Sequence, residues 1–151
     1  MNRKCLVLAA SLILGLGAGA GATAFSKSDG ESELGQIMEK VQKHKATITK
    51  GVRNVASYTK SREEVETSAK EWVKLAKESK PHNEVAKNAK GQPDPEKKWD
   101  ELIDTWVKES EKLAEIAGKA DSSQKDAKDQ LNTINKTCTE CHQTFRIEDD
   151  F

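Results

Sequence analysis

Apolar residues recur at helical spacing in four segments of the chain. The first segment runs from about Ser32 to Lys50, and Gly51 supplies a C-terminal stop. Residues three and four positions apart share one face of an α-helix, so this spacing predicts an amphipathic helix. Its apolar stripe consists of Leu34, Ile37, Met38, Val41 and Ile48.

The second segment is predicted to begin at Ser61, because Ser61 with Glu64 three residues later forms a capping-box pattern. Pro81 ends this helix. All three prolines of the chain lie between Lys80 and Glu96, and this stretch is expected to be the one long loop. The stripe of the second helix is Val65, Ala69, Trp72 and Ala76.

The third segment has the clearest apolar face. Asp94 is expected to cap the helix, Pro95 lies in its first turn, and Gly118 ends it. The apolar face consists of Trp99, Leu102, Ile103, Trp106, Leu113 and Ile116.

The fourth segment follows the candidate caps Asp121, Ser122 and Ser123 and is predicted to reach about Glu148. Its apolar positions are three and four residues apart, so two cysteines are expected on the buried stripe itself. The stripe consists of Ala127, Leu131, Ile134, Cys138, Cys141 and Phe145. No strand pattern is visible, and the chain is therefore predicted to be all-α, an antiparallel up-down-up-down four-helix bundle.

The N-terminus has the features of a secretory signal peptide. Arg3 and Lys4 precede an apolar run over residues 6–16, and Ala22-Thr23-Ala24 is a small-residue cleavage site. We expect residues 1–24 to be removed, which leaves a domain of residues 25–151. The run is too short for a permanent membrane span, and no second one follows. The mature protein is expected to be periplasmic or otherwise exported.

Charge excludes one class of partner. The signal takes two of the 25 basic residues and none of the 25 acidic ones, which leaves a formal charge of −2. Nucleic-acid binding, which needs a clearly basic surface, is therefore not expected.

The most specific local pattern is Cys138-Thr139-Glu140-Cys141-His142. This C-x-x-C-H sequence is the attachment motif for c-type haem. On a helix, thiols three residues apart face one side and can both form thioethers with haem vinyl groups, while the following histidine ligates the iron. The motif predicts one covalent haem c as the cofactor.

Three other uses of these cysteines compete with haem. A disulfide between cysteines three apart on a helix is strained. A zinc site would need His44 or His82 as a further ligand and an awkward use of the adjacent Cys141 and His142. A thioredoxin-like redox pair would follow a strand, and none is predicted.

Met38 is the favoured candidate for the sixth iron ligand. In an antiparallel bundle the start of the first helix meets the end of the fourth, so Met38 and His142 are expected at the same end. It is the only methionine after residue 24. A gap-filling core methionine is the competing interpretation. His44 is the alternative ligand, and it is expected about 9 Å further along the helix and roughly a third of a turn off the face of Met38.

The run from Cys138 to Arg146 resembles the C-terminal motif of the class II c-type cytochromes, the cytochrome c′ family. That resemblance implies a four-helix-bundle cytochrome domain over residues 25–151. In the low-spin branch of the family a first-helix methionine ligates the iron, and Ile37-Met38-Glu39-Lys40 is similar to that pattern. In the high-spin branch the iron is five-coordinate and binds nitric oxide or carbon monoxide.

The resemblance implies a one-electron carrier with His142 and Met38 as axial ligands, exchanging electrons with redox partner proteins. No catalytic constellation is visible, so an enzyme is not expected. Family members often pair through their first two helices, which makes a homodimer a possible assembly. Residues expected beside the haem are Trp72, Trp99, Leu102, Ile134 and Phe145, and Arg146 is expected either to pair with a propionate or to be solvated.

Overall fold

The protein is described here by a computed structural model, which covers residues 32–89 and 91–145. These residues form four α-helices and one short 3-10 helix, and the part of the chain described contains no β-strand. The elements are α1 (Glu33–Gly51), α2 (Val55–Ser79), η1 (Asn83–Asn88), α3 (Pro95–Gly118) and α4 (Gln124–Phe145). The predicted all-α helical bundle is confirmed.

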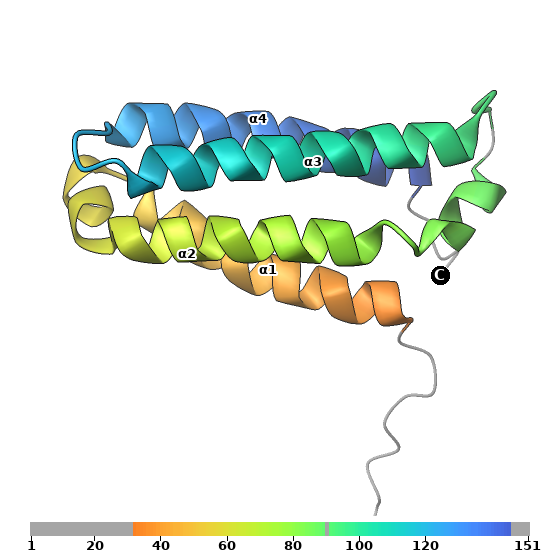
Figure 1. The fold of residues 1–151 in the computed structure, drawn as a ribbon, viewed down its shortest axis with the longest axis horizontal. Helices are drawn as coiled ribbons and strands as arrows, with labels where there is room; N and C mark the ends of the chain where they lie inside the picture. Colours follow the sequence, from red (N-terminus) through yellow and green to blue (C-terminus); the bar gives the residue numbers. More distant parts are fainter. Residues whose placement is uncertain (1–31, 90, 146–151) are drawn as a thin grey trace, which may run out of the picture.

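The helices pack in chain order. α1 packs along α2, α2 along α3, and α3 along α4. Followed by its colours, the chain in Figure 1 passes along α1, returns along α2, and repeats this course with α3 and α4. Successive helices therefore lie side by side, and their buried apolar residues form one core cluster.

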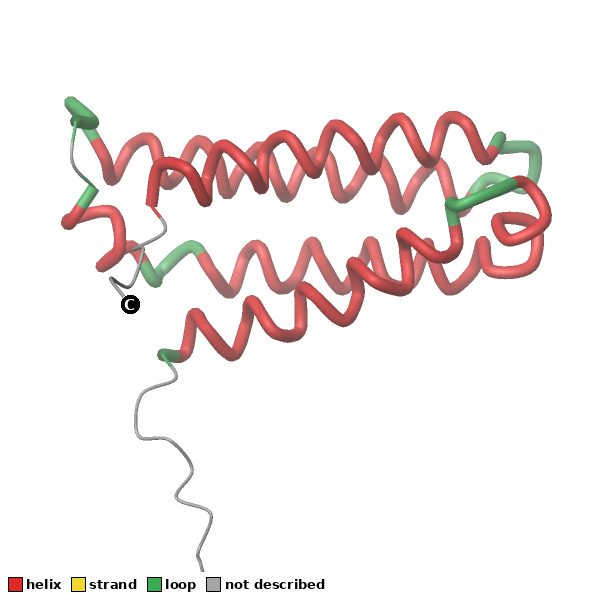
Figure 2. The backbone as a smooth tube through the Cα atoms, turned by 180° about the vertical axis from the view of Figure 1, so that it is seen from behind, coloured by secondary structure: helices red, strands yellow, loops and turns green. Residues whose placement is uncertain are grey.

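The first and last helices, α1 and α4, do not pack closely against each other. Among the described residues, α1 makes extensive helix packing only with α2, not with α4. Figure 2 shows the beginning of α1 leaning away from the other helices. The bundle is therefore least tightly closed at the end where α1 begins and α4 ends.

Three helices begin close to the predicted positions, and for two of them a cap was predicted as well. The Ser32 side chain accepts a hydrogen bond from the backbone N–H of Gly35 at 3.0 Å, which begins α1. Asp94 accepts from Lys97 at 3.2 Å and begins α3. Ser123 Oγ accepts from the N–H of Asp126 at 3.1 Å, which selects it from the three caps proposed for α4. The end of α4 beyond Phe145 lies outside the described residues.

The predicted start of α2 is wrong. The helix begins at Val55, six residues before Ser61, because Asn54 caps it by accepting a hydrogen bond from the N–H of Ser57 at 2.8 Å. Tyr58 is buried in this added stretch, and its hydroxyl lies 2.9 Å from that of Ser122. The tyrosine therefore attaches the first turns of α2 to the loop before α4.

Gly51 has a different role from the stop that was predicted. It is the last residue of α1 and is not the left-handed residue of a helix cap, since among the described glycines only Gly91 has positive φ. A Cβ at Gly51 would lie 2.4 Å from Cγ2 of Val65. The missing side chain lets the end of α1 approach α2 closely.

Gly51→Ala is therefore expected to destabilise the protein by about 1–3 kcal/mol, the usual cost of overpacking a closed contact. Urea unfolding followed by circular dichroism measures this. Gly118→Ala is the matched control, because its Cβ would meet only the flexible Glu66 carboxylate, at 3.3 Å. Equal stabilities for the two variants would contradict the packing role of Gly51.

The long connection is more ordered than predicted, because it contains η1. Ala86 of η1 is fully buried, and Val85 and Ala89 pack against the core. η1 contacts both α3 and α4 and so covers the end of the bundle where α4 finishes. Three apolar residues in a polar, proline-rich segment form no helical period long enough to predict this helix.

The proposed signal peptide, residues 1–24, lies outside the described residues. Among the residues that the structure describes, no helix is long and apolar enough to cross a membrane.

Candidate functional site

A cavity of about 540 Å³ opens at the end of the bundle where α1 begins and α4 ends. Its volume lies within the range of about 300–1,000 Å³ that is usual for ligand and cofactor sites. α1, α3 and α4 form most of its wall, and α2 and η1 contribute Trp72 and Val85. The cavity occupies the region where α1 and α4 are not packed together.

The α4 wall carries the complete C-x-x-C-H motif. Cys138, Cys141 and His142 all line the cavity. Both thiols are free and half-buried, so they lie at the edge of the buried stripe and not within it as predicted. His142 is exposed. Two thiols and an imidazole thus border one apolar space.

Met38 lies on the α1 wall of the same cavity and is half-buried. The expected meeting of Met38 with His142 at one end of the bundle is therefore seen in the structure. Neither alternative histidine lines the cavity. His82 instead faces two carboxylates, with Nε2 3.9 Å from Glu33 and Nδ1 3.7 Å from Glu84.

All three tryptophans line the cavity. Trp72 donates from Nε1 to the backbone oxygen of Val41 at 3.1 Å, and Trp99 donates to that of Lys80 at 3.1 Å. The rings of Trp99 and Phe145 meet edge to face, with centroids 5.5 Å apart. These bonds and contacts fix large flat side chains around the space, as a flat apolar ligand would require.

Two of the predicted pocket residues are not seen there. Ile134 is fully buried in the core but does not line the cavity, because it lies one helical turn deeper than Cys138. Arg146 lies outside the described residues. Trp72, Trp99, Leu102 and Phe145 do line the cavity as expected.

Several lining residues were not predicted. Gln42 and Lys45 stand four and seven residues after Met38, a spacing that could have placed them on its face. Thr137 is the buried neighbour of Cys138. Val85 could not have been found, because it comes from η1, which the sequence did not predict.

The local environment keeps both thiols protonated. Burial raises the pKa of Cys138, against the opposing effect of the nearby Lys45 charge. Burial, with added repulsion from Cys138 and Glu140, raises the pKa of Cys141 to about 11. Redox-active and nucleophilic cysteines need a lowered pKa, so the site does not favour a thioredoxin-like pair. Among the described residues no three His, Cys, Asp or Glu side chains gather to hold a metal ion.

In the cofactor-free folded chain, iodoacetamide is therefore expected to modify both cysteines slowly at pH 7.5, since the raised pKa leaves little thiolate. For Cys141 the rate should keep rising with pH and level off only near pH 11, where the thiol is half ionised. The same chain unfolded in urea is the control and should react faster at pH 7.5. Equal rates in the two states would contradict the burial of the thiols.

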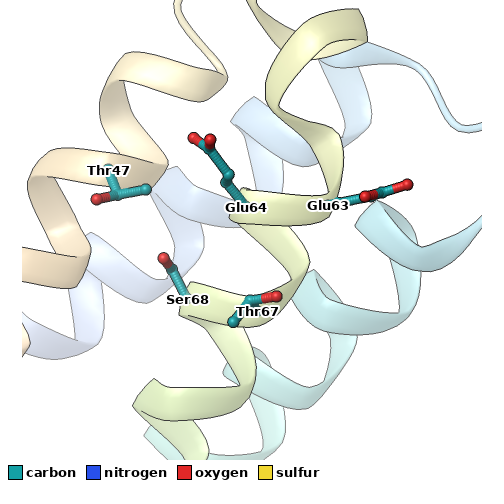
Figure 3. A pocket seen from close by; sticks show the side chains of 5 residues that line it. All are labelled: Thr47, Glu63, Glu64, Thr67 and Ser68. Atoms are coloured by element: carbon teal, nitrogen blue, oxygen red, sulfur yellow. The ribbon is translucent and has the colours of Figure 1, made fainter.

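A second hollow carries no comparable chemistry. It is an open depression of about 370 Å³ between α1 and α2, lined by Thr47, Glu63, Glu64, Thr67 and Ser68. In Figure 3 the carboxylates of Glu63 and Glu64 point away from each other. Its polar groups do not converge on a common point.

Comparison of the chain with protein-family models, curated proteins and solved structures gave no significant match.

Proposed function

We propose that this protein binds one covalent haem c in the cavity at the open end of the bundle and transfers single electrons. The observation that carries the proposal is the position of Met38 across one apolar cavity from Cys138, Cys141 and His142. The proposal includes the membership in the class II c-type cytochromes that the C-terminal motif implies. The proposal also includes export of the protein, with residues 1–24 as its signal peptide.

The residues around the cavity fit this cofactor. Histidine nitrogen and methionine sulfur are an established axial ligand pair for haem iron in electron-transfer proteins. The two free thiols stand three residues apart on one helix, with the imidazole directly after them. The tryptophans and Phe145 offer flat apolar walls of the kind that a porphyrin contacts.

Each residue has a distinct role in this proposal. The sulfur atoms of Cys138 and Cys141 would anchor the porphyrin to α4, so that the cofactor could not dissociate. Met38 and His142 would supply the two protein ligands of the iron, and a full set of ligands would limit the rearrangement on electron transfer. When bound, the haem supplies a one-electron iron couple.

The walls of the cavity determine the environment of the haem. Trp72, Trp99 and Leu102 are almost fully buried and exclude water from the interior side. An apolar surrounding and a methionine ligand both favour the reduced, less charged iron and raise the reduction potential. The exposed edge beside His142 is where a redox partner protein would approach.

A five-coordinate haem protein that binds nitric oxide or carbon monoxide is the second candidate. It is favoured by one observation, that α1 does not pack along α4 and so holds Met38 less firmly than a closed bundle would. If Met38 leaves the iron readily, the distal side becomes open to a diatomic ligand.

Absorption spectra of the ferric and ferrous protein, with and without carbon monoxide, separate the two candidates. A methionine–iron charge-transfer band and no response to carbon monoxide would support the electron carrier. A prompt shift of the ferrous spectrum on adding carbon monoxide would support the gas-binding protein instead.

A further inference from the structure

The gap between α1 and α4 leaves apolar side chains partly uncovered. In the described part of the chain, eight half-buried apolar residues pack against the core, and five of them line the cavity in this gap. They are Leu34, Met38, Val85, Cys138 and Cys141. A haem attached to α4 would engage Met38 and the two cysteines. Leu34, at the start of α1, and Val85, on η1, are left as an apolar surface at the open end of the bundle.

One basic side chain also faces the gap. Lys45 lies between the buried residues Val41 and Ile48 at the four-then-three spacing of an inward helix face, and it is half-buried and lines the cavity. Burial raises the pKa of the Cys138 thiol on α4, and the Lys45 charge opposes this effect. The ammonium of Lys45 is therefore directed across the gap towards α4.

The charge of α1 differs from that of the other helices. With four lysines and two glutamates, α1 has a formal charge of +2. The formal charge is 0 for α2 and for α4, and −3 for α3, which has seven acidic and four basic residues. An anionic segment is therefore attracted to α1 more than to any other helix.

The segment after α4, residues 146–151, has chemistry that complements this gap. Residues 148–150, called here the acidic run, are Glu-Asp-Asp and form the only run of three consecutive acidic residues in the sequence. Ile147 and Phe151 flank the acidic run. The segment thus combines negative charge with two apolar side chains, and the gap offers a positive charge and an apolar end.

The segment after α4 also starts at the right place. Phe145, the last residue of α4, is 6% exposed and lines the cavity, and its ring packs edge to face on Trp99. Residue 146 therefore follows directly from the cavity wall. Six extended residues reach about 20 Å, whereas the axes of closely packed helices are about 8–10 Å apart. The segment is long enough to cross a gap wider than one helix spacing.

We propose that the segment after α4 docks over the outer side of the gap, with its acidic run at Lys45 and its two apolar side chains on Leu34 and Val85. This contact supplies the counter-charge of Lys45 and holds the start of α1, and with it Met38, towards α4. The inference concerns two parts of the same chain and does not depend on haem.

Carbodiimide cross-linking of the native full chain tests the proposal, because this reagent joins a carboxylate to an amine only when the two are in contact. Mass spectrometry of the digest should show the acidic run joined to Lys45 at least several times more often than to Lys40, Lys43 or Lys136. All three of these control lysines are exposed, and Lys136 is the nearest lysine in sequence. Without a docked segment the half-buried Lys45 would be the least reactive of the four.

Charge-neutral variants give a second measurement. Glu148→Gln, Asp149→Asn and Asp150→Asn together should raise the rate of amine labelling of Lys45 several-fold and speed hydrogen exchange at the start of α1. The control removes three other exposed carboxylates outside the cavity by Glu63→Gln, Glu64→Gln and Asp121→Asn. It makes the same change in net charge and should alter neither rate.

Two results would overturn the inference. If the acidic run joins Lys45 no more often than Lys136, the segment does not dock on α1, as when α4 continues straight to Glu148. If a mixture of isotope-labelled and unlabelled chains gives Lys45 cross-links between the two kinds of chain, a second copy occupies the gap instead. Neither result bears on the proposed function, since the attachment of haem is measured separately by mass.

Discussion

Replacing Met38 with alanine is expected to open the iron of the proposed haem to carbon monoxide. Met38 is the only methionine that lines the cavity, and neither His44 nor His82 lines it to take its place. The variant should lose the methionine–iron charge-transfer band and bind carbon monoxide promptly in the ferrous state. Absorption spectra with and without carbon monoxide measure both effects.

Leu34→Ala is the control for this experiment, because Leu34 lies on the same wall of the cavity and has no ligating atom. It should keep the charge-transfer band and the indifference to carbon monoxide. If the spectrum of Met38→Ala also stays unchanged, the assignment of Met38 as the sixth ligand is wrong.

Trp72→Ala is expected to produce the largest loss of stability, about 3–5 kcal/mol, which is typical of removing a buried tryptophan. Trp72 is 1% exposed, and its indole N–H bonds the carbonyl of Val41, so it connects α2 to α1 at the cavity floor. Urea unfolding of the haem-loaded protein, followed by circular dichroism, measures the free energy of unfolding.

Two companion variants assign the cause of that loss. Trp72→Phe keeps most of the apolar volume and removes the hydrogen bond, and should cost about 1–3 kcal/mol for the lost bond and the smaller ring. Val73→Ala, at a half-buried position outside the cavity, should cost least. If Trp72→Ala proves no worse than Val73→Ala, Trp72 does not hold α1 to α2.

Much of the fold followed from the sequence, because amphipathic periods and caps are local signals. Ser32, Asp94 and Ser123 begin their helices through hydrogen bonds within one turn, and such bonds depend on few neighbours. The start of α2 was missed because Asn54 caps a turn whose buried residue, Tyr58, is held by Ser122, 64 positions away.

The role of Gly51 shows the same limit. In the sequence, a glycine that follows an apolar stripe is consistent with two roles, a helix cap or a close contact between two helices. Only the 2.4 Å from its missing Cβ to Val65 distinguishes the two, and that contact joins separate helices.

The candidate site was predictable to the extent that it depends on helix faces and on antiparallel order. These two rules brought Met38 to the same cavity as the C-x-x-C-H motif. They could not give the depth of the cavity along α4, which leaves Ile134 in the core below it. The same two rules do not predict η1, so its residue Val85 was missed as part of the cavity wall. Lys45 was overlooked because a lysine in a lysine-rich helix is expected to be exposed, and only the structure shows that its position lines the cavity.

The central claim is the covalent attachment of haem to α4, and the intact mass of the purified protein tests it most directly. The full chain is produced in cells that carry the machinery for c-type cytochrome maturation. Its mass is measured after denaturation, with the Cys138→Ala, Cys141→Ala chain as control. We predict that the native chain is heavier than its mature polypeptide by the mass of one haem and that the control is not. A colourless native protein with the mass of the bare polypeptide would contradict the claim.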